Sequence, residues 1–540
     1  MRISRISWEN YRRLPDGGIP VRRHLVLIGP NDSGKSSVLR ATHLCLGATR
    51  AQLYAALQVR DFTDLTRPLR LQVDLCDLDD DDRAAFPDEV MFGDTGEMLR
   101  IVVVATLNVP EGADPAVAAE TMDVRRYFEG AGHDRGPTRD QVHSLGWAYV
   151  PAARSMSREL GGTGGTMQNL LDGLDLGMDA DTVAEAATHL RETVQAARTV
   201  KDFGVELAHT LSQALPQQVR ADDIHLTPAS DLGGSPLAGM TVTVQDGEHP
   251  ARLTEQSDGV RALSLLALLG MTQRTARIVG MDEPEIHLHT TAQRAIARIF
   301  RDSPGQRLVV SHSAALVGQM DPLDIVAFGA DRAPRQLPEA NAVSGKAQAA
   351  KFWIPNTIDA LTARKILFVE GASDRLFIER FADLINLDLD RRGVAIVELG
   401  GCRNFPSVYR LLGPEGFAVP LFGITDEDAR EDWAEAVGSA PEDLESHGYF
   451  VCQPDLEGLY SNVMGLDRML KIIDEDPALP VRSLLNVSKV SSLADITLEH
   501  TAGFCRKRKL PAAIAAAEAL TDDDISALGD LCHFLRMVAA

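Results

Sequence analysis

A short glycine-rich stretch near the N-terminus constrains the fold more than any other part of the chain. Residues 29–36 read Gly-Pro-Asn-Asp-Ser-Gly-Lys-Ser, which fits the pattern G-x-x-x-x-G-K-[ST]. An apolar run from His24 to Ile28 precedes it, and a helical pattern from Lys35 to Leu46 follows it. A glycine-rich turn between a strand and a helix surrounds a phosphate with free backbone N–H groups and the positive end of the helix dipole. The stretch therefore predicts a nucleotide-binding loop in an α/β domain.

We expect this loop and the start of the following helix to bind ATP. Lys35 is expected to reach the β- and γ-phosphates, and Ser36 to hold Mg²⁺. The other predicted contacts to the nucleotide come from Asn31, Gly34 and Ser37. The alternative is a glycine turn that binds no nucleotide, and the order of strand, loop and helix argues against it.

A second apolar run, far downstream, ends in two carboxylates. Residues 278–284 read Ile-Val-Gly-Met-Asp-Glu-Pro. At the end of a strand, Asp282 suits a ligand of the Mg²⁺ shell, and Glu283 suits a general base that polarises water. The alternative is a strand that ends in an acidic turn without a chemical role. Together with the glycine-rich loop, this run predicts ATP hydrolysis.

Further strand and helix patterns indicate an α/β fold. Strands are predicted at Met1–Trp8, where we expect an edge strand, and at Leu69–Leu75, Ile101–Leu107, Met240–Val244, Ala276–Met281 and Arg307–Val310. Helical patterns between them indicate an α/β sandwich. Four consecutive aspartates, Asp79 to Asp82, are predicted to form a solvated loop rather than a metal site.

A long helical pattern follows the glycine-rich break at Gly161–Gly165. Its apolar positions are Val183, Ala187, Leu190, Val194 and Ala197, continued by Leu207, Leu211 and Leu215 until Pro216. Spacings of three and four residues mark one apolar face of a helix. An ordinary core helix is the simpler interpretation. The alternative is a helical insertion, over about 161–220, that is used for self-association.

Carboxylates also end two apolar runs in the second half of the chain, after a domain boundary that we place in the small-residue stretch Ala330–Gln348. The run from Ile366 to Val369 ends in Glu370, and the run from Val419 to Ile424 leads to Asp426 and Asp428. Ends of parallel strands point to the same crevice, and alternate residues of an extended segment face the same way. The three carboxylates are therefore predicted to share a divalent ion, Mg²⁺ or Mn²⁺.

Composition limits the partners and the compartment. The formal net charge is -23, so nucleic acid must be contacted through a local basic surface or through bound metal. None of the six cysteines forms a C-x-x-C pair, which argues against zinc knuckles and disulfide frameworks and favours a reducing cytosol. No apolar run approaches the length of about 20 residues that a membrane span needs. We expect a cytoplasmic protein without a membrane partner.

The ATPase motifs, taken in order, resemble those of ABC-type ATPases related to SMC proteins and to OLD (overcoming lysogenization defect) nucleases. The similar segments are Asn10-Tyr11-Arg12, the glycine-rich loop, a signature-like loop at 253–259, Asp-Glu-Pro-Glu-Ile-His-Leu-His at 282–289, and the switch-like strand Val309 to Ser313. The resemblance implies that His312 contacts the γ-phosphate. It also implies that Ser257 and Gly259 cap the γ-phosphate bound by another protomer, although Asp258 stands where glycine is usual.

The second half resembles the Toprim domain of OLD nucleases, where Val369-Glu370-Gly371 followed by Asp374 matches the form Val-Glu-Gly-x-x-Asp. The resemblance implies that Glu370, Asp374, Asp426 and Asp428 bind metal. It adds Glu457, from Asp455-Leu456-Glu457, with a solvated helix face as the alternative. It also implies a lysine that stabilises the transition state. We choose Lys509 from the basic run Arg506–Lys509, with Lys507 in reserve; the alternative is phosphate binding alone.

The resemblance implies an ABC-type ATPase domain at 1–345, with the helical insertion, followed at 346–540 by a Rossmann-like Toprim domain with C-terminal helices. We expect an ATP-regulated, metal-dependent DNA endonuclease that uses two metal ions. It would act as a homodimer or larger oligomer in antiviral defence or DNA processing, with a separate partner subunit as in Gabija-type systems. One alternative is a non-nucleolytic ATPase clamp of DNA repair or chromosome maintenance. Another is a Toprim primase or topoisomerase, although none of the seven tyrosines lies in a recognisable nucleophile motif.

Overall fold

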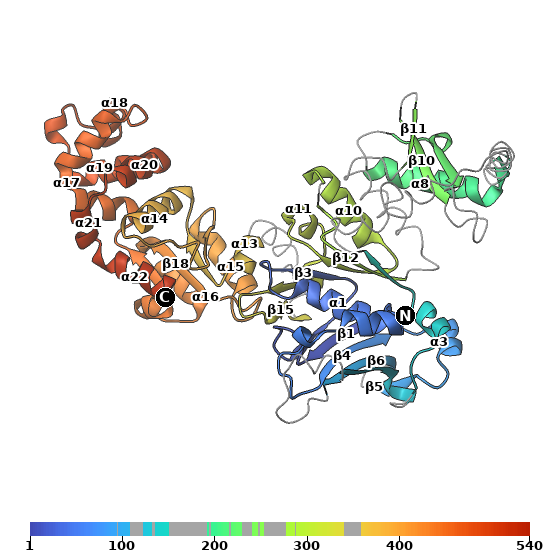
Figure 1. Cartoon of the computed structure of the whole chain (residues 1–540). Coiled ribbons are helices and arrows are strands. Elements are labelled where there is room, and N and C mark those ends of the chain that lie inside the picture. Colours follow the sequence, from blue (N-terminus) through green and yellow to red (C-terminus); the bar gives the residue numbers. More distant parts are fainter. Residues whose placement is uncertain are drawn as a thin grey trace, which may run out of the picture. The chain divides into compact units, whose positions relative to one another are not determined.

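The computed structural model describes residues 1–93, 96–107, 122–131, 135–150, 189, 192–193, 196–214, 218–228, 240–246, 249–252, 277–286, 288–339 and 358–540. By compactness the chain divides into two units, Met1–Val326 and Ala327–Ala540, which are described separately (Figure 1). The predicted signature residues Ser257 and Gly259 lie outside the described residues, as do Val183, Ala187, Leu190, Val194 and Leu215 of the predicted helical insertion.

The first unit begins with an antiparallel sheet in the strand order β2-β1-β4-β6-β5, with β7 paired to β6. Its strands are β1 (Arg2–Glu9), β2 (Gly17–Pro20), β4 (Leu69–Cys76), β5 (Met91–Gly93), β6 (Gly96–Leu107) and β7 (Met122–Phe128). The prediction that β1 is an edge strand is wrong, because β1 pairs with β2 on one side and β4 on the other. Alternation shows only that one face of a strand is buried, and an inner antiparallel strand meets that condition equally well.

A second sheet carries the candidate nucleotide site, in the order β15-β14-β3-β13-β12-β8. Its strands are β3 (Leu25–Ile28), β8 (Trp147–Val150), β12 (Ile278–Asp282), β13 (Gln306–Val310), β14 (Ile325–Phe328) and β15 (Pro334–Gln336). β3, β13, β12 and β8 run parallel. Helix α1 (Lys35–Leu46) contacts β4 and β6 of the first sheet and β12 and β13 of the second, so it packs between the two sheets (Figure 1). Parallel register brings the ends of β3, β12 and β13 to one edge.

The second sheet includes β14, which crosses the boundary at Val326, and β15, which follows it. The first unit also contains further elements. They are α2 (Arg50–Ala56), α3 (Asp80–Ala85), α4 (Arg139–Ser144), α8 (Arg198–Ala214), α10 (Thr290–Asp302), α11 (Ala314–Val317) and a small sheet of β9 (Ile224–Pro228), β10 (Met240–Asp246) and β11 (His249–Arg252), with 3₁₀ helices at Val59–Asp61, Glu129–Ala131, Ala221–Asp223 and Pro322–Asp324. Leu207 and Leu211 of α8 are fully buried and pack around Ile224. This described part of the predicted insertion therefore has a small apolar core of its own.

The four consecutive aspartates start helix α3 instead of forming a solvated loop. Asp79 caps the helix by accepting a hydrogen bond from the Asp82 N–H at 2.8 Å. Asp82 is only 2% exposed, and its carboxylate lies 3.3 Å from the Met1 ammonium and 2.8 Å from Arg277. The prediction is wrong for Asp82 because two cations distant in sequence compensate its buried charge, and local composition cannot reveal them.

The second unit is built on a parallel sheet in the order β17-β16-β18-β19. Its strands are β16 (Lys365–Val369), β17 (Val394–Glu398), β18 (Leu421–Asp426) and β19 (Tyr449–Cys452), flanked by α13 (Ile358–Thr362), α14 (Ala372–Leu384), α15 (Phe405–Leu412) and α16 (Arg430–Val437), with 3₁₀ helices at Cys402–Asn404, Glu427–Ala429 and Pro441–His447. β16 and β18 are neighbours, so the two apolar runs that end in carboxylates lie side by side.

Helices complete the C-terminal part. They are α17 (Leu456–Glu475), α18 (Val481–Ser488), α19 (Leu498–Lys507), α20 (Lys509–Ala519), α21 (Asp522–Ala527) and α22 (Gly529–Ala539), with a 3₁₀ turn at Leu493–Asp495. Phe377 and Phe381 of α14 share one buried cluster with Tyr460 of α17 and Ala516 of α20. This core fixes α17 and α20 against the helix that follows β16. In the described part of the chain, no helix has the length and apolar character of a membrane span.

Candidate nucleotide and metal sites

The loop between β3 and α1 adopts the backbone that its glycines permit. Gly34 has φ of 105° and forms the N-terminal cap of α1. A side chain at this position would be strained by the left-handed backbone and would overlap Leu14. The first N–H groups of a helix have no partner within the helix, and a glycine-rich loop that leads into them is an arrangement that binds a phosphate.

Lys35 and Ser36 link this loop to the end of β12. Lys35 is 4% exposed, and its Nζ donates to the carbonyls of Gly29 at 2.9 Å and Pro30 at 2.7 Å. Burial lowers the pKa of Lys35, although Glu283 and Asp282 oppose this shift. Ser36 Oγ donates to Asp282 Oδ1 at 3.1 Å. The structure thus brings the predicted metal residues Ser36 and Asp282 together from segments far apart in sequence.

The other predicted loop residues have different surroundings. Asn31 is exposed on the loop. Ser37 Oγ accepts a hydrogen bond from Arg12 Nη1 at 3.0 Å, and Arg12 also pairs with the buried Asp61 at 2.8 Å. Arg12, from the early Asn-Tyr-Arg segment, therefore holds the first turn of α1.

Glu283 and His312 face each other at the ends of neighbouring strands. Glu283 has a left-handed backbone with φ of 50°, and its N–H donates to Val310 O at 2.9 Å. His312 Nε2 lies 3.6 Å from Glu283 Oε1. Burial and the nearby Lys35 lower the pKa of His312, against the opposing effect of Glu283. The imidazole thus lies beside the predicted base.

Sequence reasoning missed Glu285, the second glutamate of the Asp-Glu-Pro-Glu segment. Glu285 is 8% exposed, and its carboxylate accepts hydrogen bonds from Ser311 Oγ and the His312 N–H, both at 2.7 Å. The available signal was a third acid two residues after Glu283, beyond Pro284. Acidic turns at strand ends are common, however, and only the fold shows that this side chain turns inward.

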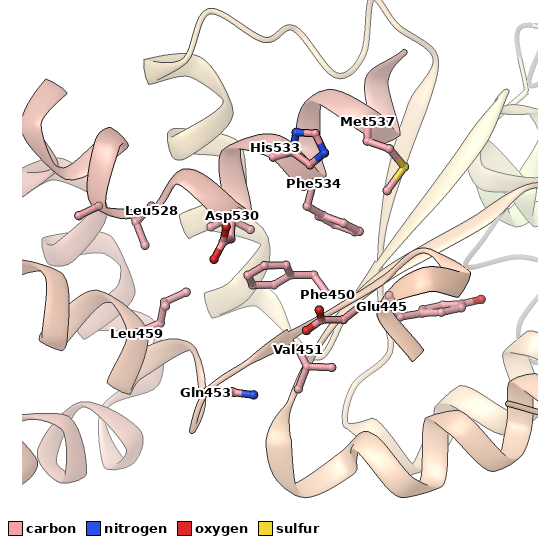
Figure 2. Close-up of a pocket in the computed structure, with 13 residues that line it drawn as sticks. Glu445, Phe450, Val451, Gln453, Leu459, Leu528, Asp530, His533, Phe534 and Met537 are labelled. Atoms are coloured by element: carbon pink, nitrogen blue, oxygen red, sulfur yellow. The ribbon is translucent and has the colours of Figure 1, made fainter. Parts of the chain in front are cut away.

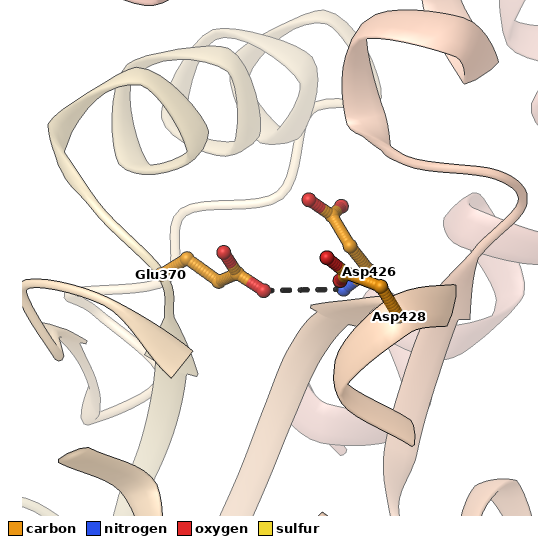
Figure 3. Close-up of side chains that lie close together, drawn as sticks. All are labelled: Glu370, Asp426 and Asp428. Atoms are coloured by element: carbon orange, nitrogen blue, oxygen red, sulfur yellow. Dashed lines mark hydrogen bonds between the residues drawn. The ribbon is translucent and has the colours of Figure 1, made fainter. Parts of the chain in front are cut away.

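The three predicted metal carboxylates of the second unit come together (Figure 3). Glu370 follows β16, Asp426 is the last residue of β18, and Asp428 lies in the 3₁₀ turn Glu427–Ala429. One oxygen from each lies within 4.8 Å of the others. Glu370 Oε1 also accepts from the Asp426 N–H at 3.4 Å. The expectation of an extended D-x-D segment is wrong, because the turn, rather than strand alternation, brings Asp428 to the cluster.

The charges in this cluster repel one another and are partly buried. Burial, followed by the charges of Glu370 and Asp374, raises the pKa of Asp426 to about 8. Burial also raises the pKa of Glu370. Such a group of oxygens is unfavourable without a cation, and Mg²⁺ and Mn²⁺ prefer oxygen ligands. The donor atoms of the cluster therefore fit a hard divalent ion.

Asp374 lies beside the cluster but does not contribute one of the three oxygens that come together. It is 7% exposed, and its Oδ2 accepts a hydrogen bond from the Gly371 N–H at 2.8 Å. Burial raises the pKa of Asp374 to about 6. Its carboxylate fixes the turn that connects Glu370 to α14.

Glu457 and Lys509 lie close to each other, and the charges of the clustered carboxylates act on Lys509. Glu457, in the first turn of α17, is 2% exposed and so does not lie on a solvated helix face. Its Oε1 is 3.7 Å from Lys509 Nζ, while its buried Oε2 has no hydrogen-bond partner in the described part of the chain. Burial lowers the pKa of Lys509, but the charges of Glu457 and the neighbouring carboxylates prevail and raise it. Lys509 is therefore a cation directed at the acidic site.

The other members of the basic run have different surroundings. Arg506 pairs with Asp455 and, at 2.8 Å, with Glu499. Lys507 and Arg508 are exposed. Lys509 is therefore the member of the basic run that lies against an acid of the site.

The raised pKa of Asp426 predicts a measurable effect on stability. Between the ordinary value of 3.8 and the folded value of about 8, the folded protein keeps a proton that the unfolded chain releases. Stability of the metal-free protein therefore falls as pH rises through this window. An Asp426→Asn variant has no carboxylate to ionise at this position and so does not lose stability in this way as the pH rises. In chelator at pH 8 we therefore expect its Tm to lie roughly 2–4 °C above that of the wild type.

Thermal unfolding in chelator at pH 4 and pH 8 checks this expectation. The two proteins should have the same Tm near pH 4, where Asp426 is protonated in the folded wild type. Added Mg²⁺ or Mn²⁺ should then stabilise the wild type much more than the variant. A variant that melts at or below the wild type at pH 8 would contradict the electrostatic account.

The second unit also contains a groove (Figure 2). It has a volume of about 510 Å³ and runs between strand β19 and helices α17 and α22. The rings of Phe450 and Phe534 pack on each other with centroids 5.5 Å apart, and Glu445 and Asp530 also line the groove. None of the clustered carboxylates lines it, so it is separate from the candidate metal site.

Two protein-family models match the chain. Residues 361–428 match the TOPRIM domain of overcoming lysogenization defect protein-like proteins, and this segment contains Glu370, Asp426 and Asp428. Residues 169–318 match an AAA domain, in a model named for the AbiEii toxin of a Type IV TA system. That segment contains Glu283 and His312.

The chain is 22% identical over 462 residues to a Thermus scotoductus protein named OLD nuclease, in a match that covers 79% of this chain and 82% of the relative. Among solved structures, the C-terminal region of the Burkholderia pseudomallei OLD protein is 24% identical, with a TM-score of 0.27, and covers 33% of this chain and 99% of its own. An SMC head bound to the C-winged helix domain of ScpA is 15% identical, with a TM-score of 0.41. This match covers 64% of the present chain and 100% of the SMC head chain. The chain thus has an ATPase domain followed by an OLD-like Toprim domain with C-terminal helices, and along most of its length it resembles the OLD nucleases.

Proposed function

We propose that this protein is a nuclease that cleaves DNA at the Glu370, Asp426 and Asp428 cluster and that its ATPase domain regulates cleavage. One observation carries the proposal: oxygens from the ends of two neighbouring parallel strands lie within 4.8 Å of one another. The named relative, an OLD nuclease, supports the same chemistry. The test is cleavage of supercoiled plasmid in Mg²⁺ or Mn²⁺, which chelation should stop.

The chain's own residues divide the work at the proposed metal centre. Glu370, Asp426 and Asp428 would hold the divalent ions, and the unpartnered Oε2 of Glu457 supplies a further oxygen in the described part of the chain. Such ions, when bound, activate water and stabilise the leaving oxygen. Asp374 keeps the Glu370 turn in place through the Gly371 N–H. Lys509, held near Glu457, offers a positive charge to the phosphate in the transition state.

The net charge of -23 makes local cations necessary for binding DNA. DNA phosphates are repelled by an acidic surface, so bound metal and Lys509 supply the attraction at the cleavage site. A bare duplex without divalent ions is therefore expected to bind weakly.

We further propose that Lys35, Ser36, Asp282, Glu283 and His312 bind and hydrolyse ATP. The hydrogen bond from Ser36 to Asp282 and the approach of His312 to Glu283 support this assignment. Asn31, Gly34 and Ser37 are proposed to complete the nucleotide site. Ser257 and Gly259 of a second protomer would close it, which requires a homodimer or larger oligomer.

The remaining proposals concern organisation and biological role. We propose domain bounds of 1–345 for the ATPase and 346–540 for the nuclease, with a helical insertion at about 161–220. A role in antiviral defence, with a separate partner subunit, rests on the resemblance to OLD-type systems. DNA processing is the alternative role for the same activity.

Replacing Lys509 tests whether this side chain acts in the transition state. We expect Lys509→Ala to lower kcat for cleavage roughly 100- to 1000-fold, because one charge aimed at the developing negative charge is lost. The affinity for DNA should change only a few-fold, since metal-held contacts remain. Lys507→Ala is the matched control: it removes an exposed lysine from the same run and should leave kcat nearly unchanged. Normal cleavage by Lys509→Ala at saturating DNA would show that Lys509 only binds phosphate.

A further inference from the structure

A buried carboxylate joins the two strand ends that carry Glu283 and His312. Glu285 lies in the turn after β12 and is 8% exposed. Its Oε1 accepts from Ser311 Oγ and from the His312 N–H, each at 2.7 Å. Both donors follow β13, the parallel neighbour of β12. One oxygen therefore holds the turn after β13 against the turn after β12.

The hydrogen bonds continue along the main chain on the far side of His312. Ser311 Oγ also accepts from the Ser313 N–H at 3.0 Å. Ser313 Oγ in turn donates to Gln293 Oε1 at 2.7 Å and caps α11 by accepting from the Leu316 N–H at 3.0 Å. The backbone is thus fixed on both sides of His312, and Glu285 is the link that ties it to the β12 turn.

Burying this acid is unfavourable for stability alone. Oε2 of Glu285 is buried and has no hydrogen-bond partner in the described part of the chain. Burial raises the pKa of Glu285 despite the opposing hydrogen bonds from Ser311 and His312. An apolar side chain of similar size would fill the space without that cost. What the carboxylate supplies, and an apolar side chain cannot, is an acceptor for the His312 N–H.

We propose that Glu285 is a positioning residue for ATP hydrolysis, which sets the His312 main chain so that the imidazole faces Glu283 and the γ-phosphate. His312 Nε2 lies 3.6 Å from Glu283 Oε1, so a shift of about 1 Å in either turn would disturb their approach. The inference rests on the proposed ATPase function. It adds the residue that holds Glu283, the proposed base, and His312 at the right distance from each other.

Steady-state ATP hydrolysis by single and double variants tests this role. Glu285→Ala should lower kcat roughly 10- to 100-fold, while KM for ATP stays within about threefold, because the phosphate loop is untouched. Glu285→Gln keeps an acceptor oxygen in the same place and should retain most of kcat. If Glu285 acts through His312, adding Glu285→Ala to a His312→Ala variant should cause no further loss. Ser311→Ala is a smaller change that removes one hydrogen-bond donor to Glu285. It should lower kcat less than Glu285→Ala does, and it should cause no further loss of kcat in the His312→Ala variant.

The outcomes separate this inference from the proposed function. Additive losses in the double variants would overturn the positioning role and leave the His312 assignment intact. A His312→Ala variant with the wild-type kcat would overturn the assignment of His312 itself, and the Glu285 inference with it. If Glu285→Ala does not fold, the Ser311→Ala cycle with His312→Ala decides the question by the same criterion.

Discussion

Replacing Lys35 with alanine should abolish ATP binding and, with it, ATP hydrolysis. The Lys35 ammonium is held inside the loop by the carbonyls of Gly29 and Pro30, so its position is set in advance of nucleotide binding. Removing a buried cation that pairs with a phosphate costs about 2–5 kcal/mol of binding free energy. Titration of ATP with Mg²⁺ into the purified variant measures the loss directly.

Two further variants separate binding from hydrolysis at this site. Arg13→Ala is the matched control, because Arg13 pairs with Asp32 of the same loop through side chains that are 71% and 69% exposed; it should bind ATP normally. Glu283→Gln should bind ATP but lose roughly 100- to 10,000-fold in kcat, since the shape is kept and the base is lost. Normal hydrolysis by Glu283→Gln would show that the base lies elsewhere.

Replacing Glu370 or Asp426 with alanine should abolish DNA cleavage. Each change removes one of the three oxygen donors that meet within 4.8 Å, and the expected loss in cleavage rate is roughly 1000-fold or more. ATP hydrolysis should stay within about twofold of the wild type, because the two sites belong to different compact units. Parallel assays of plasmid cleavage and phosphate release check both halves of the expectation.

Glu427→Gln provides a control matched in sequence position. Glu427 stands between Asp426 and Asp428, but it is exposed and pairs with Arg430 at 3.3 Å rather than joining the cluster. Its loss should leave cleavage close to the wild-type rate. If Glu427→Gln and Asp426→Ala lowered the cleavage rate equally, the shape of the turn, rather than the oxygen donors, would be what matters for activity.

The parts of the fold that sequence predicts well are buried parallel strands and the helices next to them. The helix predicted from Lys35 to Leu46 has these bounds in the structure. Strands β13 and β16 coincide with predicted apolar runs, because a strand covered on both faces reads as an unbroken apolar segment. Carboxylates directly after such runs can therefore be assigned to one sheet edge from the order of the residues alone.

The features that sequence missed depend on contacts and turns that apolar periodicity does not show. Asp82 is buried because Met1 and Arg277 approach it, and β1 is an inner strand because β2 folds back beside it. Asp428 reaches the cluster through a 3₁₀ turn that no periodicity reveals. Glu285 looks like one more acid in an acidic turn until the position of β13 is known. The contacts of Asp82 and Glu285 are long-range, whereas β1 and Asp428 depend on a hairpin and a turn, and apolar periodicity shows neither kind of feature.

Cleavage of supercoiled plasmid by purified wild type and Asp426→Ala, with Mg²⁺ and Mn²⁺ varied and ATP present or absent, tests the central claim most directly. We predict that the wild type converts the plasmid to nicked or linear forms only with divalent metal, and that Asp426→Ala leaves it supercoiled while still hydrolysing ATP. Equal cleavage by both proteins would contradict the assignment of the Glu370, Asp426 and Asp428 cluster as the nuclease centre. A wild type that cleaves no DNA form under any of these conditions would contradict the nuclease proposal and favour a non-nucleolytic ATPase clamp.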